Sequence, residues 1–378
     1  MNSWSKNLEL LIKSRTSLIW IKTKEEERLE KILNASIERL NIKRFVCWDC
    51  VNGIKGVLNE KGKFSNNPLG VLNWLKEQNP DLSTILLLKD FHKFYEDPSI
   101  NRTIKELSSS LKGTCHNLII SSHLLPKSEE LDELMAILNL PLPDQKELNN
   151  LIKRIAINTN SNLNEQDLNE LTVASSGLTE IKVKQVTAKA LTQRGKISKE
   201  DIKDILEEKK QVIARSEILE FFETQSSQDD IGGLKVLKVW LNQRHRAFSK
   251  EARDYGLPIP KGVLLVGAQG TGKSLTAKSI SKSWSMPLLR LDVGRLFSSL
   301  VGSSEARTRE TISRAEAMSP CILWIDEIDK GFGGDARSDG GTSQRVLASL
   351  LTWMAEKESA VFVIATANAI DRLPPELL

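Results

Sequence analysis

Apolar residues in the first 140 positions fall into short runs that are separated by longer stretches of mixed polarity. Stretches such as EEERLEKILNASIERL (25–40) and NPLGVLNWLKEQ (67–78) carry apolar residues at three- and four-residue spacing, which is typical of helices with one buried face. Short apolar runs that alternate with such helices predict a parallel sheet covered on both faces. The expected strands are SLIWIKT (17–23), RFVCWDC (44–50), STILLLKD (83–90) and HNLIISS (116–122).

The pattern changes at PLPDQKEL (141–148), after which the chain shows only helical spacing up to residue 223. Each stretch carries one apolar stripe, so together they predict a small helical bundle. Gly177 and Gly195 stand where two of these helices should end. The expected helices are LNNLIKRIAINT (148–159), EQDLNELTVAS (165–175), LTEIKVKQVTAKAL (178–191) and KEDIKDILEEKKQVIARSEIL (199–219).

A polar segment, TQSSQDD (224–230), is followed by a second alternation of strands and helices. We therefore expect three parts: an α/β domain over 1–140, a helical bundle over 141–223, and a second α/β core over 224–378. The strands expected in the second core are GVLLVGA (262–268), PLLRLDV (287–293), CILWIDEID (321–329) and AVFVIATAN (360–368).

Composition narrows the classes of partner. A chain of 378 residues with 40% hydrophobic and 27% charged residues suits a folded protein with more than one core. The net charge of +4 is small and its lysines are dispersed, so neither nucleic acid nor an anionic membrane is expected as a partner. No apolar run has the length of a membrane span, and the N-terminal stretch, with Glu9 in it, lacks the features of a secretory or transit signal.

The CWDC pair, Cys47 and Cys50, allows two interpretations. A zinc site needs two more ligands, which the fold would have to bring close. Alternatively, RFVCWDC (44–50) is a buried strand that runs into a turn at Asn52-Gly53, and this interpretation is favoured. The chain's four histidines have no HExxH spacing, so no metalloprotease is predicted. Possible further ligands for a zinc site would be Cys115, His116 and His123.

The segment VLLVGAQGTGKS (263–274) has the GxxxxGK[ST] spacing of a phosphate-binding loop. An apolar strand precedes it and a helical pattern follows, as this loop requires. Glycines let the backbone amides turn towards phosphate oxygens, Lys273 adds a charge, and Ser274 offers a hydroxyl to Mg²⁺. The expected nucleotide contacts are Gly267, Ala268, Gln269, Gly270, Thr271, Gly272, Lys273, Ser274 and Leu275.

CILWIDEID (321–329) supplies the acidic partners of that loop. Its apolar residues predict a strand through the core that leaves Asp326 and Glu327 at the carboxyl end, where open parallel sheets bind ligands. Asp326 is expected to hold Mg²⁺ together with Ser274, and Glu327 to take a proton from an attacking water. Solvated acids at a strand end are the alternative, but the apolar residues before them and their distance downstream of Lys273 favour the catalytic role.

Residues 229–378 resemble the core of the AAA family of ATPases in more than these two motifs. DDIGGLKVLK resembles the segment in which Asp230, Ile231 and Gly232 flank the adenine, and VGSSEARTRETISRAEAMSPCILWIDEID resembles the family's central region. IATAN resembles the sensor strand, and the resemblance implies that Asn368 orients the water or reads the terminal phosphate. It also implies ATP and Mg²⁺ as cofactors, and ring-shaped homo-oligomers of the full-length protein that act on a protein partner.

Two departures from the family modify this expectation. The loop that usually carries an aromatic residue before Val-Gly has Leu300, Val301 and Gly302 here, which puts polypeptide threading in doubt. NAIDRLPPELL resembles the approach to the arginine fingers, but the sequence ends at Leu378 and Arg372 lies too early to be one. The C-terminal lid is also missing, so the chain as it stands is expected to bind ATP well and to hydrolyse it slowly.

The first half of the chain resembles a degenerate copy of the same module. Thr23 to Glu26 replace the glycines of a phosphate loop and add negative charge, while STILLLKD keeps Asp90 but continues with Phe91 in place of a glutamate. The bundle over 141–223 resembles the family's lid. The alternative is an unrelated α/β domain followed by a bundle. Over its whole length, including Trp48-Asp49, the chain resembles AAA-domain proteins encoded by algal plastid genomes and by cyanobacteria, which implies a plastid stroma or a cyanobacterial cytoplasm.

These observations predict an α/β protein of two P-loop NTPase-like modules, of which the second binds ATP and Mg²⁺. Its expected activity is ATP hydrolysis coupled to remodelling or regulation of an unidentified protein. An ATP-responsive regulatory or scaffold module with little hydrolysis is the alternative. A nucleic-acid ATPase is disfavoured, because an aromatic content of 5% and dispersed lysines offer neither stacking surfaces nor a basic stripe.

Overall fold

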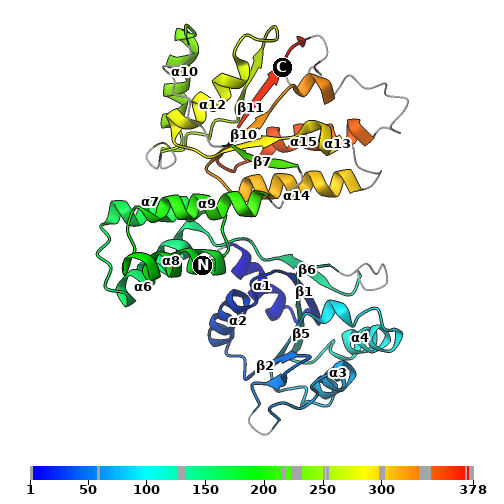
Figure 1. The fold of residues 1–378 in the computed structure, drawn as a ribbon. Coiled ribbons are helices and arrows are strands. Elements are labelled where there is room, and N and C mark those ends of the chain that lie inside the picture. Colours follow the sequence, from blue (N-terminus) through cyan, green and yellow to red (C-terminus); the bar gives the residue numbers. More distant parts are fainter. Residues whose placement is uncertain are drawn as a thin grey trace. The chain divides into compact units, whose positions relative to one another are not determined.

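The computed structural model describes residues 3–57, 60–125, 133–214, 218–222, 232–249, 252, 255–297, 303–331, 342–370 and 373. They form two compact units, Met1–Pro141 (unit 1) and Leu142–Leu378 (unit 2) (Figure 1). Each unit contains a mostly parallel sheet, which confirms the predicted fold class of two α/β modules. Within the described residues, no helix combines the length and the apolar composition needed to cross a bilayer.

Unit 1 contains a six-stranded sheet with the order β3-β2-β4-β5-β1-β6. All neighbours run parallel except β3, which pairs antiparallel with β2 through a tight connection at Asn52-Gly53. The predicted sheet lacked β3 and β6, because edge strands of three and four residues leave little hydrophobic pattern. The strands are β1 (Leu18–Lys22), β2 (Arg44–Asp49), β3 (Gly53–Lys55), β4 (Thr84–Lys89), β5 (His116–Ser122) and β6 (Ala136–Asn139).

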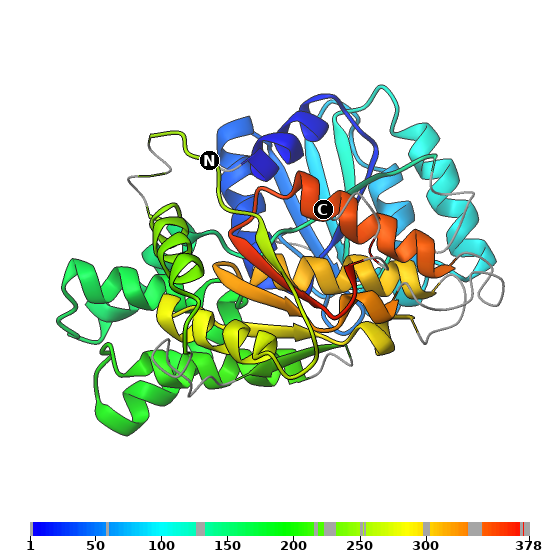
Figure 2. The same cartoon turned by 90° about the horizontal axis from the view of Figure 1, so that it is seen from above.

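Helices cover both faces of this sheet (Figures 1 and 2). Strand residues alternate between the two cores: Leu18 and Trp20 of β1 face one, and Ile19 and Ile21 face the other. The helices α3 (Pro68–Lys76) and α4 (Pro98–Ser110) pack on the first face, and α1 (Ser3–Lys13) and α2 (Glu26–Leu40) on the second.

Unit 2 begins with the predicted helical bundle. Its apolar stripes meet in one core that includes Leu148, Leu171 and Val183. Asp144 caps the first helix, because its carboxylate accepts from the Glu147 amide while the Glu147 side chain accepts from the Asp144 amide. The helices are α6 (Gln145–Asn158), α7 (Glu165–Ser175), α8 (Glu180–Arg194) and α9 (Asp201–Ala214).

The sheet of unit 2 has the order β7-β9-β10-β11-β8 and is parallel except for β7, which pairs antiparallel with β9. The helical pattern predicted a helix up to residue 219, but the helix ends at Ala214 and LEFF forms the edge strand β7. Phe222 at its end packs edge-on against Trp324, with ring centroids 5.7 Å apart. The strands are β7 (Leu219–Phe222), β8 (Gly262–Val266), β9 (Leu288–Leu291), β10 (Cys321–Ile325) and β11 (Val361–Ala367).

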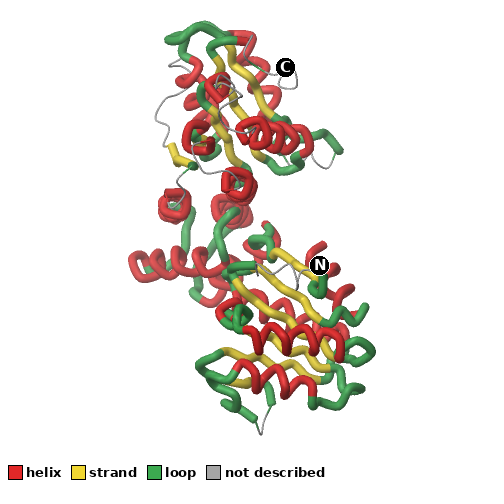
Figure 3. Tube along the Cα trace, turned by 90° about the vertical axis from the view of Figure 1, so that its right-hand side faces the viewer, coloured by secondary structure: helices red, strands yellow, loops and turns green. Residues whose placement is uncertain are grey.

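Helices again lie on both faces of this sheet, as the tube in Figure 3 and the ribbon in Figure 1 show. The helices α10 (Lys235–Arg246) and α12 (Lys273–Trp284) pack on one face. The opposite face packs against α13 (Val293–Phe297), α14 (Ser303–Ala317), α15 (Thr342–Glu356) and Ile213 at the end of α9.

The two sheets share one topology. In unit 1 the order β2-β4-β5-β1 corresponds to β9-β10-β11-β8 in unit 2. In each set of four, the strand that comes first along the chain (β1 or β8) lies beside the strand that comes last (β5 or β11). In both units a short 3₁₀ helix follows the central strand: η1 (Phe91–Lys93) after β4, and η3 (Ile328–Gly331) after β10. Positions at the carboxyl edges of the two sheets can therefore be matched residue by residue.

Candidate nucleotide site

The loop between β8 and α12 has the backbone of a phosphate cradle. The amide of Gly267 donates to the Ala367 carbonyl at 3.2 Å, which ties the start of the loop to β11. Gly270 and Gly272 both have φ of 83°, a left-handed conformation that strains any residue with a Cβ. The loop then enters α12 at Lys273, so the first amides of this helix face the space above the loop. The predicted contacts Ala268, Gln269, Gly270, Thr271, Gly272 and Leu275 are all solvent-exposed.

Lys273 lies folded over this loop. Its ammonium donates to the carbonyls of Gly267 at 2.7 Å and Ala268 at 2.8 Å, and to Asn368 Oδ1 at 3.0 Å. The Thr271 hydroxyl donates to the Ala268 carbonyl at 2.8 Å and closes the loop from the other side. The positive charge of Lys273 is therefore held between the phosphate loop and the end of β11.

Asp326 stands at the carboxyl end of β10 and faces this loop. Its Oδ1 accepts from the Ser274 hydroxyl at 3.4 Å and from the Thr366 hydroxyl at 2.7 Å. A hydroxyl and a carboxylate on the same side of the loop are oxygen ligands of the kind that Mg²⁺ prefers. The Arg290 guanidinium approaches the other carboxylate oxygen, with Nη2 at 3.8 Å from Oδ2.

Glu327 adopts a left-handed conformation with φ of 50°, which turns its side chain out of the strand direction. Its amide donates to Thr366 Oγ1 at 2.9 Å, and its Oε1 accepts from Asn368 Nδ2 at 3.4 Å. The same Asn368 side chain accepts from Lys273. Acid, amide and ammonium thus form one connected chain of contacts.

The structure brings together the predicted residues Gly267, Lys273, Ser274, Asp326, Glu327 and Asn368. Gly232 is exposed and lies three residues before α10, and among the described residues no hydrogen bond joins it to the loop. Four further predictions lie outside the described residues: Asp230, Ile231, the Leu300-Val301-Gly302 loop, and Arg372.

Two residues at this edge were not predicted from the sequence. Thr366 is buried and joins the Asp326 carboxylate to the Glu327 backbone, and Arg290 on β9 stacks over Trp324 at 5.4 Å while it approaches Asp326. The two-residue periodicity of a strand could have identified Thr366, since it lies two positions before Asn368, the first residue after β11. Arg290 has no such signal, because only the sheet order places β9 beside β10.

Unit 1 lacks a phosphate cradle at the matching place. Only residues 23–25 connect β1 to α2, whereas residues 267–272 connect β8 to α12. The amide of Thr23 donates to the Ser122 carbonyl at 2.7 Å, the bond that Gly267 makes in unit 2. Glu25 is buried and paired with Arg28. Acids therefore occupy the place where a nucleotide would need amides.

The acidic strand end of unit 1 differs from its prediction by one position. Asp90 has φ of 50° and precedes η1, just as Glu327 has φ of 50° and precedes η3. Asp90 therefore matches Glu327, and Lys89 takes the place of Asp326. The sequence comparison places Asp90 opposite Asp326 and Phe91 opposite Glu327. The backbone corrects this alignment by one position. Lys89 is engaged in an ion pair with Glu30.

Burial and charge act together on Glu26 at the start of α2. Burial raises the pKa of its carboxyl above the ordinary value, and the negative charge of Asp90 raises it further. An anionic phosphate beside this group would meet more negative charge. The expected loss of phosphate binding in unit 1 is thus supported by both the shortened loop and its electrostatics.

The CWDC cysteines do not form a joint site. Cys47 packs into the core under α1 and α2, while Cys50 packs against the core on the opposite face. Burial raises the pKa of the Cys47 thiol to about 12. Cys47 is thus a packed strand thiol, in line with the favoured interpretation of the sequence.

Family models match the chain in three places. The N-terminal domain of SpoVK-like AAA ATPases matches residues 4–140, and the second domain of that group matches residues 146–216. The model of the ATPase family associated with various cellular activities (AAA) matches residues 263–378, which contain the phosphate loop and both acids.

Some relatives match over the full length of the chain, and others over a part of it. It is 44% identical to the uncharacterized AAA domain-containing protein ycf46 of Guillardia theta, over 100% of this chain and 74% of the relative. The ycf46 protein of Gracilaria tenuistipitata var. liui is 46% identical, over 100% of this chain and 77% of the relative. The ATP-dependent zinc metalloprotease FtsH of Cyanidium caldarium is 38% identical over 40% of this chain and 26% of its own length.

Proposed function

Because the chain belongs to the AAA ATPase family, with ycf46 proteins as relatives along its whole length, we propose that the loop and acid edge of unit 2 bind and hydrolyse ATP with Mg²⁺. One observation carries this proposal. Lys273, Asn368 and Glu327 form a continuous chain of contacts above a glycine loop at the start of a helix. This geometry suits phosphoryl transfer, in which positioning and charge stabilisation supply most of the catalysis.

The residues at this edge have different roles, which follow from their chemistry. The loop amides and the Lys273 ammonium hold the phosphates. Ser274 and Asp326 are the oxygen donors for Mg²⁺, which supplies neutralisation of the charge on the outer phosphates. The existing contact of both residues through Asp326 Oδ1 supports this assignment, since the two donors already face one point.

Glu327 is the general base in this proposal. Its left-handed backbone directs the carboxylate out of the sheet edge, where it can take the proton of an attacking water. Asn368 contacts both Glu327 and Lys273, so it can position that water relative to the terminal phosphate. Thr366 holds the base in place through the Glu327 amide.

We infer that hydrolysis is coupled to remodelling or regulation of a protein partner through ring-shaped assemblies, as is common in this family. Unit 1 serves this activity as a scaffold or partner-binding module, because its edge has lost the phosphate loop and carries Lys89 where unit 2 has Asp326. The relatives named above suggest that the protein acts in a plastid stroma or in a cyanobacterial cytoplasm.

The Glu327→Gln variant tests the catalytic assignment. The amide keeps the size of the carboxylate but cannot accept a proton, so steady-state ATP turnover should fall by about 100-fold or more. Equilibrium titration should show ATP affinity within a few-fold of the parent chain. Asp329→Asn, two residues further along in η3, is the matched control and should keep the turnover of the parent chain. Unchanged turnover in Glu327→Gln would remove this residue from the mechanism, and a parent chain without turnover would favour an ATP-responsive scaffold.

A further inference from the structure

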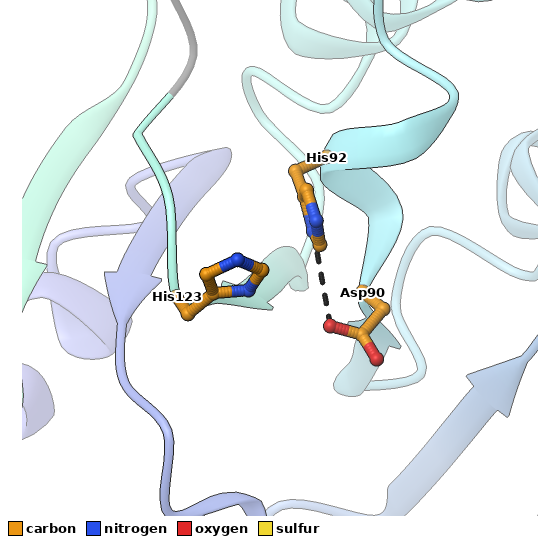
Figure 4. Close-up of side chains that lie close together, drawn as sticks. All are labelled: Asp90, His92 and His123. Atoms are coloured by element: carbon orange, nitrogen blue, oxygen red, sulfur yellow. Dashed lines mark ion pairs between the residues drawn. The ribbon is translucent and has the colours of Figure 1, made fainter.

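Three side chains gather at the carboxyl edge of the unit 1 sheet, two from the end of one strand and the third from the end of its neighbour (Figure 4). They are Asp90 and His92 after β4, and His123 after β5. One ligand-type atom from each lies within 4.8 Å of the other two. The rings of His92 and His123 meet edge to face, with centroids 4.7 Å apart. Within the described part of the chain, no other group of three such side chains comes this close.

The backbone holds this cluster on rigid elements. β4 and β5 are adjacent parallel strands with Lys89 opposite Ser121, and the Asp90 amide donates to the Ser121 carbonyl at 3.0 Å. After His123, the Leu124 amide donates to Ser122 Oγ at 3.0 Å, and the Leu124 carbonyl accepts from the Trp20 indole at 3.0 Å. Hydrogen bonds therefore fix the backbone at both strand ends that carry the three side chains.

The places of these residues match the catalytic edge of unit 2. Asp90 corresponds to Glu327 by its left-handed φ, and His123 is the first residue after β5, as Asn368 is the first after β11. In unit 2 this frame brings Glu327 and Asn368 to 3.4 Å. The same frame in unit 1 thus aims a carboxylate and an imidazole at a common point, in a module without a phosphate loop.

His92 supplies the second independent observation. Its side chain is only 7% exposed, and its Nδ1 is buried without a hydrogen-bond partner among the described residues. The nearest charged group, Asp90 Oδ1, is 3.8 Å away, which is too far for a hydrogen bond. A buried ring nitrogen without a partner costs free energy, and a ligand placed between it and Asp90 would remove that cost.

We propose that Asp90, His92 and His123 form a binding site for one divalent transition-metal ion of the Zn²⁺ class. Two imidazoles and one carboxylate are a donor set typical of Zn²⁺ and related ions, whereas Mg²⁺ and Ca²⁺ favour oxygen ligands alone. Metal–ligand distances of about 2.0–2.2 Å require the donor atoms to approach one another further. Asp90 and His123 are exposed, so their side chains can rotate towards the His92 ring.

The charge around the cluster favours a cation. Glu26 lies close enough for Asp90 to raise its pKa, so a second carboxyl group adds negative potential at this edge. Lys89, the cation that precedes Asp90, is paired with Glu30. Lys93 on η1 carries a positive charge, which opposes the binding of a cation. Its side chain is exposed to solvent, which screens that charge. A bound ion would join the ends of β4 and β5 and so stabilise unit 1, independently of ATP in unit 2.

Metal titration of the full chain tests this site. The protein carries a histidine-free tag, is stripped with a chelator, and is titrated without nucleotide in a thiol-free reductant. Co²⁺ is the spectroscopic probe and Zn²⁺ the competitor. We expect one equivalent with a dissociation constant on the order of 1 μM or lower, without a cobalt–thiolate absorption band, and without displacement by excess Mg²⁺.

Two variants locate the ion. His123→Ala removes an exposed ring, and Asp90→Asn keeps a residue that tolerates the left-handed backbone, so both should fold. Each should lower the affinity by about 10-fold or more. His245→Ala in unit 2 and Cys50→Ser are the controls, and both should bind as the parent chain does. The proposal would be overturned if no stoichiometric ion binds, or if His123→Ala and Asp90→Asn bind the ion as tightly as the parent chain does. In either case His92 and His123 would be a packed aromatic pair only.

Discussion

At the scale of single residues, the two sheet edges show how one backbone frame carries different chemistry. Glu327 and Asp90 share a left-handed conformation, but the residue before each is Asp326 in unit 2 and Lys89 in unit 1. The exchange of a carboxylate for an ammonium reverses the charge at the place expected to hold Mg²⁺. The two modules therefore differ at this edge in a few side chains as well as in the length of the loop before the first helix.

Lys209 on α9 is a buried cation whose effect on stability depends on pH. Its side chain is 2% exposed, and burial lowers its pKa from 10.5 to about 8. The folded state therefore disfavours the charged amine, and this destabilisation is complete below pH 8. Between pH 8 and 10.5 the unfolded chain binds more protons than the folded one, so this contribution to stability rises with pH.

The Lys209→Met variant should accordingly be more stable than the parent chain at pH 7, by at most about 3 kcal/mol. The gain should shrink towards pH 9.5, because the neutral amine that the folded state favours then costs less free energy to form. Urea unfolding of both chains at the two pH values measures this difference. Lys210→Met is the matched control at the next position, where the ammonium pairs with Glu207 at 2.7 Å. A gain of equal size at both pH values would contradict the argument.

At the scale of elements, the central strands could be predicted from the hydrophobic pattern, whereas the short edge strands could not. The expected strand HNLIISS coincides with β5, and the expected strands at 17–23 and 83–90 contain β1 and β4. The edge strands β3, β6 and β7 were missed, since three or four residues hold too little pattern and are selected by pairing with a neighbour. The one-position offset of Asp90 was also unreadable, because it depends on where β4 ends.

A close contact joins the helical bundle to the second core within unit 2. Gly177 has φ of 85°, and a Cβ there would lie 2.1 Å from the Ala317 carbonyl oxygen at the end of α14. The glycine is thus required twice, once for its conformation and once for the approach of another backbone. Gly195 also has positive φ, at 70°, but an added Cβ there would meet no atom within 4 Å.

We expect Gly177→Ala to lower the stability of unit 2 by about 2–4 kcal/mol and Gly195→Ala by about 1 kcal/mol. Both variants share the conformational penalty, and only the first adds the clash with Ala317. Thermal unfolding of the two variants beside the parent chain measures the difference. Equal shifts would show that the turn after α7 does not pack against α14.

At the scale of the whole molecule, the chain combines one sheet that carries a glycine-rich loop and paired acids at its edge with another of the same topology that lacks the loop. The sequence was sufficient to predict this asymmetry, because GxxxxGK[ST] and an apolar run that ends in Asp-Glu are local patterns that occur once. It did not reveal the cluster of Asp90, His92 and His123. Those residues come from two strand ends, and only the parallel pairing of β4 with β5 brings them together.

The most direct test of the central claim is the number of ATP molecules bound per chain. Equilibrium titration in Mg²⁺ should give one equivalent, held by the loop of unit 2. Lys273→Ala should abolish this binding or weaken it by about 100-fold, since it removes the ammonium that spans Gly267 and Asn368. Two equivalents per chain, or one equivalent with unchanged affinity in Lys273→Ala, would contradict the account.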